Sequence, residues 1–101
     1  MTDTTVAQTI LMQLGGRKFL AMTGASHLVG STDSLAFELP SGFATNKANI
    51  CRVTLNGLDL YDMEFCRLRA GKVTLVSRDS NIYAEDLQRM FTAATGLDTH
   101  L

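Results

Sequence analysis

Three segments in the middle of the chain alternate apolar and polar residues, and this pattern restricts the fold more than any other feature. They are LAFEL (35–39), ICRVTL (50–55) and LYDMEFCRLR (60–69). A period of two residues is typical of strands that bury one face. The residues predicted to face the core are Leu35, Phe37, Leu39, Cys51, Val53, Leu55, Tyr61, Met63 and Phe65. Turn residues follow each segment, at Pro40, Asn56-Gly57 and Ala70-Gly71, so we expect antiparallel strands in series.

Two further segments, RKFLAM (17–22) and KVTLVS (72–77), are also predicted as strands. Between the first of these and residues 35–39 lies GASHLVGST (24–32), with two glycines and several small polar residues. We interpret it as a glycine-punctuated connection rather than as an element. The sheet is therefore expected to contain four or five strands.

A helix is predicted at each end of the strand region. Thr5 and Gln8 have the spacing of a capping box, and Gly15-Gly16 would end that first helix. Ser80 or Asn81 is expected to cap the second helix, and Gly96 to close it. Its predicted core-facing stripe consists of Tyr83, Leu87, Met90, Phe91 and Ala94.

The order of these elements indicates an α+β fold. We expect an antiparallel sheet of four to five strands, with the N-terminal and C-terminal helices packed on one face. A chain of 101 residues suits a single domain, 1–101, with one core. The other sheet face would be left solvated or available to a partner.

Composition narrows the functional classes. A net charge of −1 argues against a generally basic nucleic-acid binder. The apolar runs are too short for a membrane span, and MTDTTVAQ does not resemble a secretory leader. Cys51 and Cys66 are expected to be free thiols in a reducing compartment. We therefore expect a cytoplasmic protein with no membrane association and no cofactor.

No motif predicts catalysis or metal binding. GASHLVGST lacks the lysine of a phosphate-binding loop and the second glycine of a nucleophile elbow. On an extended backbone, Ser26 and His27 would point to opposite sides, which makes them a poor nucleophile–base pair. His27 and His100 are far apart, and the cysteines lack the close spacing of zinc ligands. A composite metal site of both cysteines and a histidine is the remaining alternative.

Charged residues around the last two predicted strands are the candidate partner-binding residues. The basic ones are Arg67, Arg69 and Lys72, at the Ala70-Gly71 turn. The acidic ones are Asp59, Asp62 and Glu64. A basic β-hairpin can contact phosphate groups or an acidic protein surface, and ordinary cross-strand ion pairs are the alternative interpretation. An open sheet edge also makes a homodimer plausible.

Three longer segments carry a resemblance: LGGRKFLAMTGA, TLNGLDLYDMEFCRLRAGK and NIYAEDLQRMFTAATGLDTHL. Together they resemble a group of small uncharacterised proteins encoded by phages, prophages and other mobile elements. The resemblance covers about residues 14–101 and transfers no site residues. It implies an accessory protein of the anti-defence or anti-CRISPR type, which binds host machinery such as a CRISPR–Cas complex or another defence nuclease.

The leading hypothesis is a non-enzymatic protein that inhibits a host protein or protein–nucleic-acid complex by covering a functional surface. The alternative is a nucleic-acid-binding accessory protein that uses the basic hairpin. A small hydrolase using Ser26 or the carboxylates is the weakest of the three hypotheses.

Overall fold

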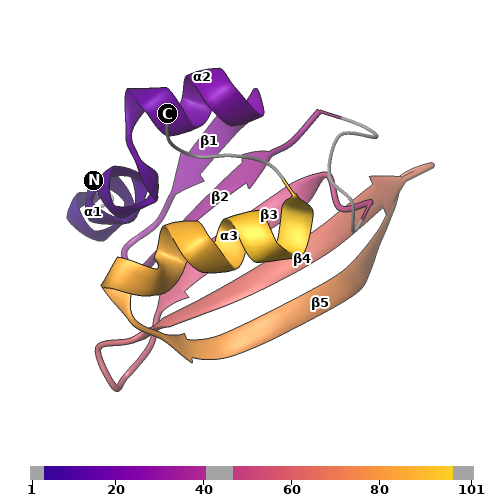
Figure 1. Cartoon of the computed structure of the whole chain (residues 1–101). Coiled ribbons are helices and arrows are strands. Elements are labelled where there is room, and N and C mark those ends of the chain that lie inside the picture. The colour runs from indigo at the N-terminus through magenta and orange to yellow at the C-terminus, as the bar shows by residue number, and fades with distance from the viewer. Residues whose placement is uncertain (1–3, 41–46, 97–101) are drawn as a thin grey trace.

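Five antiparallel strands form one sheet, in which each strand pairs with its neighbours in sequence, in the order β1-β2-β3-β4-β5 (Figure 1). The strands are β1 (Ser26–Gly30), β2 (Ser34–Glu38), β3 (Ile50–Leu55), β4 (Tyr61–Arg69) and β5 (Lys72–Ile82). The helices are α1 (Thr5–Leu14), α2 (Arg17–Thr23) and α3 (Leu87–Thr95), the last after a 3-10 turn, η1 (Ala84–Asp86). This computed structural model describes residues 4–40 and 47–96. The α+β class with an antiparallel sheet and terminal helices is confirmed.

The helices cover one face of the sheet, and four phenylalanines join them to it. Phe19 of α2 meets Phe37 of β2 and Phe91 of α3, with ring centroids 5.3 and 5.1 Å apart. Phe91 also contacts Phe65 of β4, at 6.0 Å. All four rings are completely or almost completely buried, and the buried apolar residues form one cluster. The core therefore lies between the helices and this face of the sheet.

The strand faces follow the predicted alternation closely. Eight of the nine residues expected inside are buried, and Leu55 is half-buried at the end of β3. Ala70 and Gly71 form the two-residue turn between β4 and β5, with φ angles of 54° and 77°. The turn at Asn56-Gly57 is longer than a two-residue hairpin: the Asn56 side-chain oxygen accepts hydrogen bonds from the backbone N–H groups of Leu58 and Leu60.

The prediction of a strand at 17–22 was wrong, because this segment is the helix α2. Phe19 and Thr23, one helical turn apart, are both buried, so the pattern has a period of four and not two. Gly16 and Gly24, at φ angles of 62° and 72°, bracket the helix. A side chain at Gly24 would also press on Pro40, 2.8 Å from the added carbon. The two glycines thus allow sharp changes of direction on both sides of a short helix.

The interpretation of 24–32 as a connection was also wrong. Residues 26–30 form the edge strand β1, which pairs with β2 through an irregular register between Ser26 and Val29. The strand was hidden because its side chains are exposed to half-buried and show no alternation. Only its pairing with β2, a tertiary contact, makes it a strand.

Both helix starts differ from their predictions. Thr4, and not Thr5, precedes α1, and Gln8 Nε2 donates a hydrogen bond to Thr4 Oγ1 over 3.3 Å. At the other end, β5 continues to Ile82 and so includes Ser80 and Asn81, the expected caps. Tyr83 lies before the helix on extended backbone and is 59% exposed, so it is not a core residue.

The rest of the predicted helical stripe is correct. Leu87 and Phe91 are fully buried, and Met90 and Ala94 pack against the core. Gly96 ends α3 at a φ of 73°. The tail after Gly96 and most of the connection after Pro40 lie outside the described residues.

Candidate interaction surface

The sheet face opposite the helices is not covered by any described element (Figure 1). Two rows of cross-strand neighbours run over it from edge to edge. One row consists of Ser26, Glu38, Ile50, Cys66 and Leu75, and the other of Val29, Ala36, Arg52, Glu64 and Arg78. This uncovered face therefore has two kinds of surface. The row that contains Arg52, Glu64 and Arg78 is charged, and the row that ends with Cys66 and Leu75 is apolar toward β5.

An apolar patch lies on this face near the β4–β5 hairpin. We define it as Ile50, Cys66, Leu68, Val73 and Leu75, of which Leu68 and Val73 are also cross-strand neighbours. Val73 and Leu75 are 58% and 56% exposed, and Leu68 is 38% exposed. Single exposed apolar residues are ordinary, but a contiguous group on a flat face is typical of an interaction site.

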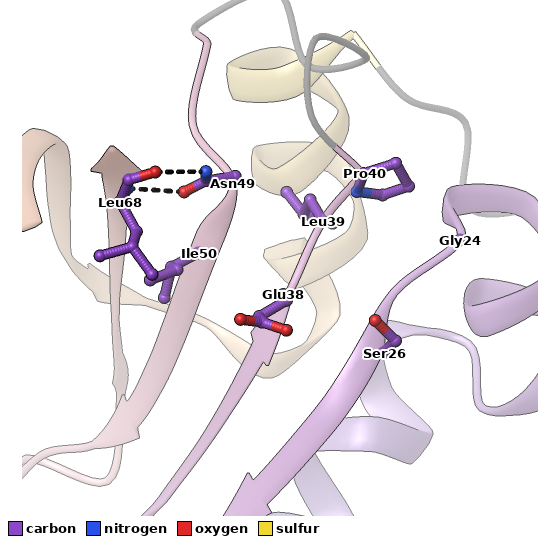
Figure 2. Close-up of a pocket in the computed structure, with 8 residues that line it drawn as sticks. All are labelled: Gly24, Ser26, Glu38, Leu39, Pro40, Asn49, Ile50 and Leu68. Carbon is purple, nitrogen blue, oxygen red and sulfur yellow. Dashed lines mark hydrogen bonds between the residues drawn. The ribbon is translucent and has the colours of Figure 1, made fainter. Parts of the chain in front are cut away.

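A hollow of about 400 Å³ adjoins the apolar patch and shares Ile50 and Leu68 with it (Figure 2). Its other lining residues are Gly24, Ser26, Glu38, Leu39, Pro40 and Asn49. Asn49 orders one wall: its side-chain amide accepts a hydrogen bond from Leu68 N–H over 2.7 Å and donates one to Leu68 C=O over 2.9 Å. The amide thus extends the β3–β4 ladder by one residue, which fixes Leu68 between the hollow and the patch.

Asp62 lies at the opposite end of the uncovered face and is held by internal contacts. It accepts hydrogen bonds from Asn56 Nδ2 at 3.1 Å and from Asn81 N–H at 3.2 Å, and Arg78 is 3.5 Å away. These hydrogen bonds, first that of Asn56, lower the pKa of the Asp62 carboxyl. Asn81 has a left-handed φ of 58°, so Asp62 supports the irregular end of β5.

The three basic candidate residues lie on the β4–β5 hairpin, on the face opposite the apolar patch. Arg67 and Arg69 follow Phe65 on the strand face that bears the helices, and Lys72 is the cross-strand neighbour of Arg69. The hairpin extends past α3, so no described helix covers this face there (Figure 1). With Ala70, Thr74 and Val76 the three cations line a hollow of about 550 Å³. Within residues 4–40 and 47–96, none of the three forms an ion pair.

The six candidate residues thus do not form one surface. Arg67, Arg69 and Lys72 are together on the helix side of the hairpin. Glu64 lies on the uncovered face between Arg52 and Arg78, and Asp59 is in the loop before β4. Sequence reasoning missed the apolar patch, although pairing across the Ala70-Gly71 turn would have placed Leu68 beside Val73, on the face opposite Arg67 and Arg69.

Ser26, His27 and Glu38 form a contact group beside the first hollow. The expectation that Ser26 and His27 diverge was wrong, because His27 has a φ of 52° in the irregular part of β1. Ser26 Oγ is 3.1 Å and Glu38 Oε2 is 2.6 Å from His27 Nδ1. A catalytic triad needs the hydroxyl and the carboxylate on different ring nitrogens. Here both contact the same nitrogen, so the group cannot relay a proton from the serine.

The two cysteines face opposite sides of the sheet. Cys51, beside Phe65, is completely buried, and burial raises the pKa of its thiol. Cys66, beside Ile50, belongs to the apolar patch, and its pKa is raised mainly by desolvation. A composite metal site using both thiols would need them on one side. In the described part of the chain no group of three or more potential ligand residues is positioned to hold a metal ion.

Comparisons with known proteins add no family: no family model, curated protein or solved structure matches this chain. Within the described ranges, none of the helices has the length and apolar character needed to cross a membrane.

Proposed function

We propose that this protein is a non-enzymatic binding domain that covers a functional surface of a host protein complex. The observation that carries the proposal is the apolar patch beside the 400 Å³ hollow on the uncovered sheet face. A flat apolar area with an adjacent recess can receive a side chain from a partner, which is the usual arrangement of a binding hot spot.

The charges around the hairpin suggest the chemistry of the partner. Arg67, Arg69 and Lys72 lie directly behind the apolar patch, on the other face of the same hairpin. A partner that encloses the hairpin would meet apolar residues on one side and cations on the other. Its contact surface is therefore apolar at the centre and acidic at the rim. A standard interface buries about 800 Å² per partner, which a domain of this size can supply.

The biological context comes from the resemblance to proteins of phages and mobile elements. It points to a host defence complex, such as CRISPR–Cas or another nuclease, in the cytoplasm of the host cell. Inhibition would be stoichiometric, because the protein occupies a surface and does not turn over.

Capture from host cells, followed by titration, tests this proposal. The tagged protein is compared with Val73→Asp and with Val29→Asp, a control at another exposed valine of the same face, far from the patch. We expect Val73→Asp to lose the captured complex and Val29→Asp to retain it. The purified protein should inhibit the isolated complex with a one-to-one end point. Equal capture by both variants, or inhibition far below one equivalent, would contradict the proposal.

Nucleic-acid binding is the second candidate, and the basic hollow favours it. Three cations without ion pairs in the described region converge from two strands, and phosphate groups are suitable counter-charges. The test is a salt titration of DNA and RNA binding. We expect Arg67→Ala/Arg69→Ala to reduce the salt slope, by about 0.9 per lost phosphate contact on duplex DNA. Arg17→Ala/Lys18→Ala, an exposed pair on α2, is the control. Absence of binding at low salt would exclude this candidate.

A further inference from the structure

The two edge strands of the sheet differ in how far they are protected. β1 is short, has an irregular register near His27, and is backed by α1 at Gly30, where an added side chain would lie 2.9 Å from Ala7. β5 is the longest of the described strands, with 11 residues, and among the described elements it has extensive contacts with β4 alone. Long exposed edges are uncommon in monomeric proteins because their free backbone groups can pair with another chain.

We propose that two copies of this protein pair through β5, antiparallel, about a two-fold axis at Thr74. The segment from Lys72 to Leu75 pairs regularly with β4 through the turn, and the first irregularity of the register comes after Leu75. All four of its residues are exposed. This segment of β5 therefore presents a regular, accessible edge on which a second strand can add.

The side chains determine the register. Paired residues of an antiparallel ladder share a sheet face, so the axis of a symmetric pair must pass between one residue and its own copy. An axis at Thr74 places Val73 opposite Leu75 of the second copy, and Leu75 opposite Val73. These are the two most exposed apolar residues of the strand, at 58% and 56%. Apolar cross-strand pairs of this kind stabilise antiparallel sheets.

The neighbouring registers are less favourable. An axis at Leu75 places the irregularity at Val76 directly beside the axis, opposite Thr74 of the second copy, and brings Lys72 opposite Arg78. With the axis at Thr74, Val76 lies opposite Lys72, at the end of the regular pairing. An axis at Val73 places Leu75 opposite Gly71, which has no side chain to contact. With the axis at Thr74, the two Lys72 residues are separated by four positions, about 13 Å, along the strands. That separation exceeds the screening length of about 8 Å at physiological salt.

Edge pairing leaves both faces of the sheet accessible, so this inference does not depend on the proposed function. The apolar patches of the two copies would become one continuous area on the uncovered face. The two basic hollows would lie side by side on the helix face.

Sedimentation equilibrium of the pure protein over a wide concentration range tests self-association without any partner. We expect the average mass of the wild type to rise toward that of a dimer. Val29→Lys, on the other edge strand, should behave in the same way, and Leu75→Lys should remain a monomer with an unchanged circular dichroism spectrum. A wild type that remains a monomer throughout, or a Leu75→Lys variant that dimerises like Val29→Lys, would overturn the proposal.

Disulfide cross-linking tests the register. Directly opposed residues have Cα atoms about 4.5–5.5 Å apart, within the reach of a disulfide. In a Cys66→Ala background, Thr74→Cys should cross-link rapidly with oxidised glutathione, whereas Lys72→Cys should not, because its copy lies about 13 Å away along the strands. Failure of Thr74→Cys to cross-link, or equally fast cross-linking of Lys72→Cys, would refute the axis at Thr74.

Discussion

Truncation of Phe91 to alanine should destabilise the domain more than any exposed substitution. The Phe91 ring lies at the centre of the core, with centroids 5.1, 6.2 and 6.0 Å from those of Phe19, Phe37 and Phe65. These partners belong to α2, β2 and β4, so one side chain joins two helices to the sheet. None of the four rings is more than 1% exposed, and solvent cannot fill the space that the substitution leaves.

The size of the stability loss in Phe91→Ala follows from the burial of the ring and from its contacts with the other rings. Phe→Ala in a core costs about 3–5 kcal/mol, and each aromatic pair adds about 0.5–1.5 kcal/mol beyond the buried area. We expect the upper half of the first range, because the strands that hold Phe37 and Phe65 are paired on both sides and cannot collapse into the cavity. A domain of this size has a total stability of about 5–15 kcal/mol. The melting temperature should fall by about 4–8 °C for each kcal/mol.

Urea unfolding followed by far-ultraviolet circular dichroism measures this loss. Phe91→Leu retains most of the volume and should cost clearly less than Phe91→Ala. Tyr83→Ala is the matched aromatic control, because Tyr83 is 59% exposed and should change stability by only about 0.5 kcal/mol. If Phe91→Ala proved as stable as Tyr83→Ala, or if Tyr83→Ala were the more harmful change, the packing described for α3 would be wrong.

Three further predictions concern the sheet. Asp62→Asn should lower stability at neutral pH: the folded-state pKa of Asp62 is lowered, so its contribution is present above the ordinary pKa and is lost as pH falls through the folded-state value. Urea unfolding of the wild type and of Asp62→Asn at neutral and acidic pH should show that their difference in stability shrinks at acidic pH. A difference that stays constant with pH would contradict this prediction. Ala70→Asn should raise the melting temperature, because Ala70 has a left-handed φ of 54°. That conformation costs about 1–2 kcal/mol in ordinary residues and less in asparagine. An unchanged or lower melting temperature would argue against the turn geometry. Iodoacetamide should leave Cys51 intact until the protein unfolds, because Cys51 is buried and Cys66 is partly exposed. Cys66 should react slowly, because the pKa of its thiol is raised, as is that of Cys51. Mass spectrometry identifies the labelled residue.

The sequence was sufficient to predict a strand and its buried face wherever a local pattern coincided with burial. Residues 35–39, 50–55 and 61–65 alternate because one face of each strand lies against the core, and this alternation is visible without a structure. The Ala70-Gly71 turn and the end of α3 at Gly96 were predictable from local chemistry of another kind, since Gly71 and Gly96 have a left-handed backbone that glycine adopts readily. The fold class follows from these elements and their order.

The tertiary structure alone decided the elements whose side chains carry no such pattern. β1 is a strand because β2 pairs with it, and its exposed residues give no periodic burial. The four consecutive apolar residues of RKFLAM fit a strand or a helix, and the period of four became visible only with the burial of Phe19 and Thr23 in the structure. Phe19 there meets Phe37 and Phe91, which are far away in the sequence.

The make-up of the candidate interaction surface was also decided by the tertiary structure. Each charged candidate could be identified in the sequence, but only cross-strand register divides them between the two faces of the sheet and places Leu68 beside Val73. A register that is set by hydrogen bonds between strands determines which residues share a face, and a linear sequence does not contain that information until the strands are paired.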